Sequence, residues 1–335
     1  MMEPTAHAGA MRQFVLFARA TGLPLDEILD DELKAVADSS ATEERIPASA
    51  MVDMMQVCAA VSGRHDLGVA FAMWGNLRGY GPLSLLWDHC PTLAEMFRVN
   101  QRYVHLESAA LATRIEEEGD ETAVRHLLLL PVRYGGSQFL EGTMTLGMRV
   151  ARLVLGEDWA PLRFEFDHPA PRDTRYLRGI FRCPIEFRAD RNAMVVRKSD
   201  MTRPAPAGNA HMLAYLERHM ATMDRARPID LLQQIEQFIA ANLMNGGATL
   251  PNVAGLSAMS VRTLQRQLAA RGVSFADLLA GVRKRTAEEY FRTENRPNLT
   301  QLAYRLGYAD ASAASRYLRT HLDTGTRAFM ASIRF

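Results

Sequence analysis

Residues 250–322 read LPNVAGLSAMSVRTLQRQLAARGVSFADLLAGVRKRTAEEYFRTENRPNLTQLAYRLGYADASAASRYLRTHL, and this stretch decides the fold of the C-terminal part of the chain. Its first part, about 250–270, predicts a short helix, a break at Ala258-Met259 and a second helix that Ser260 caps. Leu264 and Leu268 recur four residues apart, which gives the second helix one apolar stripe. The spacing predicts a helix-turn-helix unit.

The opposite face of that second helix carries Arg262, Gln265 and Arg266. In a DNA major groove, arginine reads guanine and glutamine reads adenine through paired hydrogen bonds. The alternative is an ordinary solvated helix face. Taken alone, this first unit leaves both interpretations open.

A second stretch, about 299–322, repeats the plan roughly fifty residues later. Leu306-Gly307 supplies a turn, Asp310 or Ser312 is placed to cap the next helix, and the spacing predicts a second candidate reading helix. Residues 274–293 have apolar side chains at helical spacing and predict one connecting helix. Such a rod can hold two reading helices about one helical turn, or roughly 34 Å, apart along a duplex.

These motifs resemble the AraC/XylS class of transcription regulators over about eighty residues. The matching residues are Ser260–Arg266, Phe275–Leu279, Val282-Arg283, Leu302–Tyr308 and Ser315-Arg316. The resemblance implies base readers at Arg262, Gln265 and Arg266 in the first unit and at Ala311, Ser312, Ser315 and Arg316 in the second. With the helical pattern it gives the expected DNA-binding set: Ser260, Arg262, Gln265, Arg266, Ser312, Ser315, Arg316 and Arg319.

The second unit departs from the family pattern in two places. Ala314 stands where the family usually has an aromatic residue, and Ala311 and Ala313 add few polar groups. We therefore expect this unit to contribute more to backbone grip and DNA shape reading than to base contacts. The family's closing glycine, proline, tyrosine and arginine are replaced by Asp323, Thr326, Phe329 and Met330, which predicts a looser or weaker unit.

Charge is distributed unevenly along the 335 residues. Residues 249–335 hold 13 Arg and Lys against 6 Asp and Glu, whereas the remainder holds 26 against 32. The basic end has the sign needed to neutralise DNA phosphates. No apolar run approaches the roughly 18 residues of a membrane span, and the start does not read as a secretion signal, so we expect a cytoplasmic protein without membrane contact.

The chain lacks the common sequence signatures of metal and catalytic sites. Its three cysteines, Cys58, Cys90 and Cys183, are far apart, and its nine histidines form no pair with zinc-ligand spacing. No nucleophile elbow or phosphate-binding loop is present. We expect no metal, no cofactor and no enzymatic activity.

The part before the helix-turn-helix stretch predicts an α+β domain over residues 1–224. The first ten residues look frayed, helices are expected at Met11–Ala20 and Leu25–Ala37, and residues 109–132 alternate around Gly119 as an antiparallel hairpin. Residues 225–228 are the expected linker, and 229–335 the all-α DNA-binding domain. Residues 79–204 resemble, more weakly, the arabinose-binding-type N-terminal regulatory domain of one branch of the family.

Aromatic residues near the glycine-rich stretch 75–82 are candidates for a ligand pocket. Ordinary core packing is the alternative for each of them. The candidates are Trp74, Tyr80, Trp87 and Tyr103, with Tyr134 in a second glycine-containing stretch.

The expected function is a sequence-specific DNA-binding transcription regulator. The resemblance implies an activator that works with RNA polymerase on promoter half-sites, and a first domain that senses a small-molecule effector, forms a homodimer, or does both. The alternative is an enzyme or small-molecule-binding module in the first domain, with the C-terminal helices mediating protein contacts.

Overall fold

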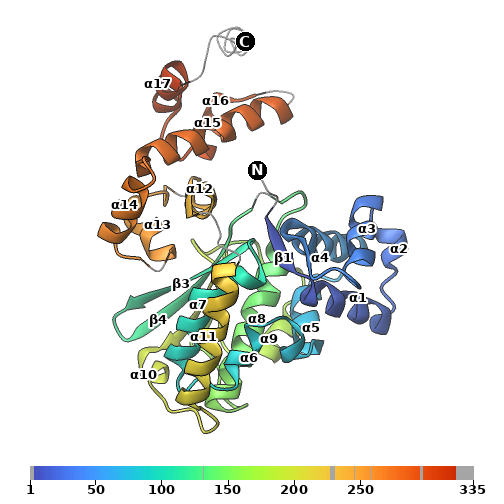
Figure 1. Ribbon diagram of the computed structural model, residues 1–335. Coiled ribbons are helices and arrows are strands. Elements are labelled where there is room, and N and C mark those ends of the chain that lie inside the picture. The colour runs from blue at the N-terminus through green and yellow to red at the C-terminus, as the bar shows by residue number, and fades with distance from the viewer. Residues whose placement is uncertain are drawn as a thin grey trace. The chain divides into compact units, whose positions relative to one another are not determined.

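A computed structural model describes residues 4–130, 132–226, 231–244, 246–257, 259–294 and 297–321. The chain divides into two compact units, Met1–Arg227 and Pro228–Phe335 (Figure 1). Within the described ranges, no helix is long and apolar enough to cross a membrane.

The first unit is rich in helices. They are α1 Gly9–Thr21, α2 Leu25–Ile28, α3 Asp31–Ser39, α4 Ala48–Ser62, α5 Leu67–Trp74, α6 Ser84–Trp87, α7 Leu93–Glu107, α8 Ser137–Leu155, α9 Arg175–Phe181, α10 Lys198–Met201 and α11 Ala210–Ala226, with a 3₁₀ turn at Leu77–Gly79. The prediction of a single helix at Leu25–Ala37 is wrong, because two helices, α2 and α3, cover this stretch. Asp30 caps α3 by accepting a hydrogen bond from the Leu33 N–H, so the chain leaves the helix at Leu29 and restarts.

A five-stranded sheet forms the β part of this unit. Its strands are β3 Leu111–Glu118, β4 Glu121–Leu128, β5 Arg163–Phe166, β6 Ile185–Phe187 and β7 Ala193–Arg197, in the order β3-β4-β7-β5-β6. Only β5 and β6 pair in parallel. β3 and β4 form the expected hairpin, and Gly119 adopts a φ of 64° at its turn, a conformation that favours glycine.

The expectation that the first ten residues fray is wrong for residues 4–10, whereas residues 1–3 lie outside the described residues. Thr5–His7 forms β1, which pairs antiparallel with β2, Arg45–Pro47. The Arg45 guanidinium also donates to the hydroxyl and the carbonyl oxygen of Thr5. The partner strand lies about forty residues away, so a local sequence pattern does not reveal this pairing.

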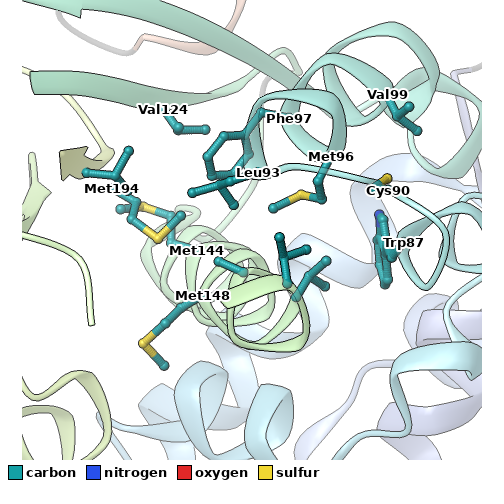
Figure 2. Packing of buried hydrophobic residues seen from close by; sticks show 14 of the residues in the cluster. Trp87, Cys90, Leu93, Met96, Phe97, Val99, Val124, Met144, Met148 and Met194 are labelled. Atoms are coloured by element: carbon teal, nitrogen blue, oxygen red, sulfur yellow. The ribbon is translucent and has the colours of Figure 1, made fainter. Parts of the chain in front are cut away.

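Helix α8 lies at the centre of the first unit. It packs against α4, α5 and α7 and against strands β4 and β7. Figure 2 shows Met144 and Met148 of α8 near Phe97 of α7, Val124 of β4 and Met194 of β7. Unbranched methionines fit the uneven space between helices and sheet. Helices α7 and α11 lie side by side (Figure 1), joined by Arg98 to both carboxylate oxygens of Glu217.

The C-terminal unit, Pro228–Phe335, consists of helices joined by turns and loops, with no strand among its described residues. Its helices are α12 Leu231–Asn242, α13 Leu250–Leu256, α14 Val261–Ala269, α15 Phe275–Thr293, α16 Leu299–Arg305 and α17 Ala311–His321. The expected order, an α+β domain followed by an all-α domain, is confirmed. Helix α11 runs through Ala226, so the first two residues of the expected linker are helical, and Arg227 and Pro228 lie outside the described residues.

Candidate functional site

The first helix-turn-helix unit consists of α13 and α14. Thr249 caps α13, and Ser260 caps α14 by accepting a hydrogen bond from the Thr263 N–H at 3.1 Å. The predicted stripe of Leu264 and Leu268 is buried, as are Val253, Ala254 and Leu256 of α13. Burial of this stripe fixes which side of α14 faces outward.

The outward side of α14 carries Arg262, Gln265 and Arg266, all of them exposed. Among the described residues, their side chains form no hydrogen bond or ion pair. Two guanidinium groups and an amide therefore stand together on one short helix with their donors unused within the unit. The Ser260 hydroxyl differs from these three, because it is engaged at the cap.

The second helix-turn-helix unit consists of α16 and α17. Asn298 caps α16, and Asp310 accepts a hydrogen bond from the Ala313 N–H at 2.8 Å at the start of α17. Leu302, Leu306 and Leu318 are buried against Ala287 and Tyr290 of α15. The four closing positions that depart from the family pattern, Asp323, Thr326, Phe329 and Met330, lie outside the described residues.

Helix α17 presents a sparser outward side than α14. Ser312, Arg316 and Arg319 are exposed and Ser315 is partly exposed, whereas Ala314 is fully buried. Arg319 folds back on its own helix and donates to the Ser315 carbonyl oxygen at 3.3 Å. Because Ala314 faces inward, its small size affects the packing of the unit rather than the outward set of polar groups.

Side-chain contacts from α15 hold the second helix-turn-helix unit, α16 and α17, in place. The sequence pattern did not predict these contacts. The Arg283 guanidinium lies 4.4 Å from the Tyr308 ring centroid, and the Tyr317 hydroxyl donates to the Ala280 carbonyl oxygen at 2.6 Å. In the sequence, Arg283 stands out only through the family resemblance, since its contact with Tyr308 forms only when α15 packs against the α16–α17 turn.

The N-terminal unit, Met1–Arg227, contains a cavity of about 140 Å³. Of the five aromatic candidates for ligand binding, Tyr80 and Trp87 line it. The other three candidates do not: Trp74 is 46% exposed and packs on Phe17, Tyr134 is 40% exposed, and Tyr103 is buried beside α11, where its hydroxyl donates to the Glu217 carbonyl oxygen at 3.4 Å. Most of the wall is apolar and comes from segments far apart in the sequence: Met11, Met51, Met55, Phe71, Leu83, Val104, Leu111, Phe139, Leu146 and Val150.

Three buried polar atoms line this cavity with no hydrogen-bond partner in the described part of the chain. They are Tyr80 Oη, Glu107 Oε2 and His126 Nδ1. The other Glu107 oxygen accepts from the Leu83 N–H at 2.5 Å. Burial raises the pKa of Glu107 to about 7, lowers the pKa of His126 to about 4, and raises the pKa of Tyr80 to about 12.

The glycine-rich stretch shapes the wall beside Glu107. A Cβ atom at Gly81 would overlap Glu107 Oε2, so a side chain there would displace the carboxylate. Sequence reasoning missed Glu107 and His126, since each lies in a regular element among ordinary neighbours. No sequence signal separates them, because α7 also carries Glu95 and Arg98, and β4 carries Arg125 directly before His126.

The comparison with known families decides the identity. Residues 32–205, more than half of the chain, match the model described as the arabinose-binding domain of AraC transcription regulators, N-terminal. The chain belongs to the AraC family of transcription regulators. This AraC-family chain is 24% identical over 270 residues to the HTH-type transcriptional regulator VirS of Mycobacterium tuberculosis, covering 80% of this chain and 79% of that protein.

Other comparisons find regulators as well. The ornithine utilization regulator of Pseudomonas aeruginosa is 23% identical over 264 residues, covering 78% of this chain and 77% of its own. A superposition on the crystal structure of the transcriptional regulator CdpR from Pseudomonas aeruginosa gives a TM-score of 0.47 at 18% sequence identity. It covers 92% of this AraC-family chain and 94% of the CdpR chain. The matched family and the two sequence relatives are transcription regulators, so the chain is a DNA-binding transcription regulator and not an enzyme, which removes the alternative of an enzymatic N-terminal domain.

Proposed function

We propose that this AraC-family regulator reads a specific DNA sequence chiefly through the outward side of α14. The observation that carries the proposal is the set of uncommitted donors on Arg262, Gln265 and Arg266. A capped helix with paired-donor side chains is suited to the major groove, where arginine reads guanine and glutamine reads adenine.

Helix α17 has the secondary role in this proposal. Ser312, Ser315, Arg316 and Arg319 place hydroxyls and guanidiniums along its outward side, which suits phosphate contacts and shape reading. The excess of Arg and Lys over Asp and Glu in residues 249–335 supports the same partner. The two helices engage adjacent half-sites about one helical turn apart.

We further propose that the N-terminal unit, Met1–Arg227, controls DNA binding and that the protein is an activator. A small-molecule effector in the cavity, association of two copies, or both together shift the protein toward a state in which both helix-turn-helix units engage DNA and hold RNA polymerase nearby. The cavity with its unpaired polar atoms supports the effector. Exposed Met212 and Tyr215 on α11, 41% and 58% exposed, support self-association.

In vitro selection from a random duplex pool tests the proposed DNA reading. The full-length protein is used, and affinity for the recovered sequences is followed against salt concentration. The proposal expects an enriched motif of two half-sites about one turn apart, with affinity that falls steeply as salt rises. Binding that stays independent of sequence at every salt concentration would overturn it.

A further inference from the structure

The wall of the cavity in the N-terminal unit, Met1–Arg227, carries a negative charge and no offsetting positive charge in its described part. Among the described residues that line it, Glu107 is the only Asp, Glu, Arg or Lys. The two histidines on the wall, His7 and His126, both have a pKa lowered by burial, so neither supplies a positive charge near neutral pH. The Arg45 guanidinium lies outside this wall, donates to oxygens of Thr5 and Leu106, and lowers the pKa of Glu107 less than burial raises it.

The Glu107 carboxylate is half satisfied. Its Oε1 atom accepts a hydrogen bond from the Leu83 N–H, which holds the group in place, while its Oε2 atom is buried and has no hydrogen-bond partner among the residues that the structure describes. Above its pKa of about 7 the ionised carboxylate only accepts hydrogen bonds, and leaving a buried acceptor unpaired costs free energy. Tyr80 Oη and His126 Nδ1 on the same wall are also unpaired, and each is able to accept a hydrogen bond.

We propose that the effector is a small primary amine with an apolar body, whose ammonium group donates to Glu107 Oε2. This assignment rests on the proposed role of the cavity as the effector site. An ammonium group has three N–H donors and the opposite charge to the carboxylate. The apolar body packs on the aliphatic, methionine and phenylalanine side chains that make up most of the wall.

The same wall selects against other ligand classes. A carboxylate or phosphate would meet Glu107 with no arginine or lysine on the described wall to offset the repulsion. A free amino acid brings such a carboxylate with its amine. A sugar would bury several hydroxyls against mostly apolar side chains, and each unpaired hydroxyl lowers affinity. A neutral alcohol satisfies Glu107 Oε2 without neutralising its charge.

The size of the cavity limits the ligand. Its volume of about 140 Å³ is close to the roughly 150 Å³ of an engineered apolar cavity that binds benzene. One ring, or a chain of similar volume, with one amine therefore fits. Benzylamine and hexylamine are suitable probes of this class.

The test measures affinity of the full-length protein by titration calorimetry for matched probes at pH 8, where Glu107, with a pKa of about 7, is mostly ionised. The probes are benzylamine and hexylamine, the alcohols benzyl alcohol and hexanol, the acids benzoate and hexanoate, and L-arabinose. We expect at least one amine to bind tenfold or more tightly than its alcohol and its acid. Equal or tighter binding of an alcohol, an acid or arabinose overturns the proposal, and so does the absence of amine binding.

Two variants test whether the ammonium group of the ligand binds at Glu107 and near Tyr80. Glu107→Gln keeps the shape and an oxygen for the Leu83 N–H, and should weaken amine binding at least tenfold with little effect on the alcohols. Tyr80→Phe should weaken it several-fold. Glu27→Gln, an exposed carboxylate on α2, is the control and should change nothing. Retained secondary structure by circular dichroism shows that Glu107→Gln is folded, and undiminished amine binding by that folded variant overturns the assignment.

DNA binding separates this proposal from the broader one. If amines bind but leave affinity for the selected duplex unchanged, the ligand class stands and effector control fails. If the selection recovers a motif while no amine binds, DNA reading stands and the ligand class fails.

Discussion

Arg283 of α15 donates from Nε to the carbonyl oxygen of Leu306, 3.0 Å away, in the turn between α16 and α17. The same guanidinium lies over the Tyr308 ring. One side chain thus fixes the turn of the second helix-turn-helix unit to the connecting helix. The position of α17 therefore depends on a contact outside its own helix pair.

Replacing Arg283 with alanine should loosen α16 and α17. Loss of the hydrogen bond and the cation–π contact removes about 1–2 kcal/mol. Hydrogen exchange followed by mass spectrometry should show roughly tenfold faster exchange in residues 299–321, with exchange in α4 and α8 unchanged. Lys284→Ala is the neighbouring control. Equal protection in the two variants would contradict the role given to Arg283.

Gly307 should tolerate alanine less well than Gly272 does. Both glycines have positive φ, 73° and 71°, so alanine strains the backbone at either position by about 1 kcal/mol. At Gly307 the new Cβ would also overlap the Leu243 carbonyl oxygen, whereas at Gly272 nothing lies within 4 Å. Thermal unfolding followed by circular dichroism should place Gly307→Ala several degrees below Gly272→Ala. Matching midpoints would show that the turn does not approach the end of α12 closely.

Glu107→Gln should stabilise the first unit in alkaline solution. The folded-state pKa of about 7 lies above the usual 4.5, so the wild-type free energy of unfolding falls as pH rises from about 4.5 to 7 and is level above. The variant lacks this loss and should exceed wild type by up to roughly 3 kcal/mol at pH 8, with no gain below pH 4.5.

Other groups that face Glu107 do not produce this difference between variant and wild type. An arginine such as Arg45 stays charged between about pH 4.5 and 8, and Tyr80 has a pKa of about 12. The histidines His7 and His126 are present in both proteins, so their titration cancels in the comparison. Urea unfolding followed by tryptophan fluorescence reports this unit selectively, because Trp74, Trp87 and Trp159 all lie in it. A variant that is less stable than wild type at pH 8 would contradict the burial of the Glu107 charge.

Long periodic elements were predictable from sequence, and contacts between distant segments were not. Helices α4, α8 and α15 and the β3–β4 hairpin follow from apolar spacing and turn residues, and the buried stripe of α14 follows from Leu264 and Leu268. The short strand β1 depends on a partner about forty residues away. Its strand propensity alone is too weak to predict it.

The cavity shows the same limit. The aromatic candidates include Tyr80 and Trp87, which line the cavity, but composition does not separate them from Tyr103, which packs in the core. Glu107 at the end of α7 and His126 on β4 meet the cavity only after the helix has packed on the sheet. Ionisable side chains acquire their unusual pKa values from that packing, which no local sequence pattern records.

The most direct test of the central claim compares two affinities for each arginine variant of α14. Fluorescence anisotropy gives the affinity for the selected duplex and for a scrambled duplex of the same length. Arg262→Ala and Arg266→Ala should each weaken binding to the selected duplex by about 1–3 kcal/mol, with a much smaller change on the scrambled one. Arg271→Ala, the same charge change beyond the end of α14, should affect both duplexes equally. An unchanged ratio of the two affinities in both α14 variants would show that this face does not read DNA sequence.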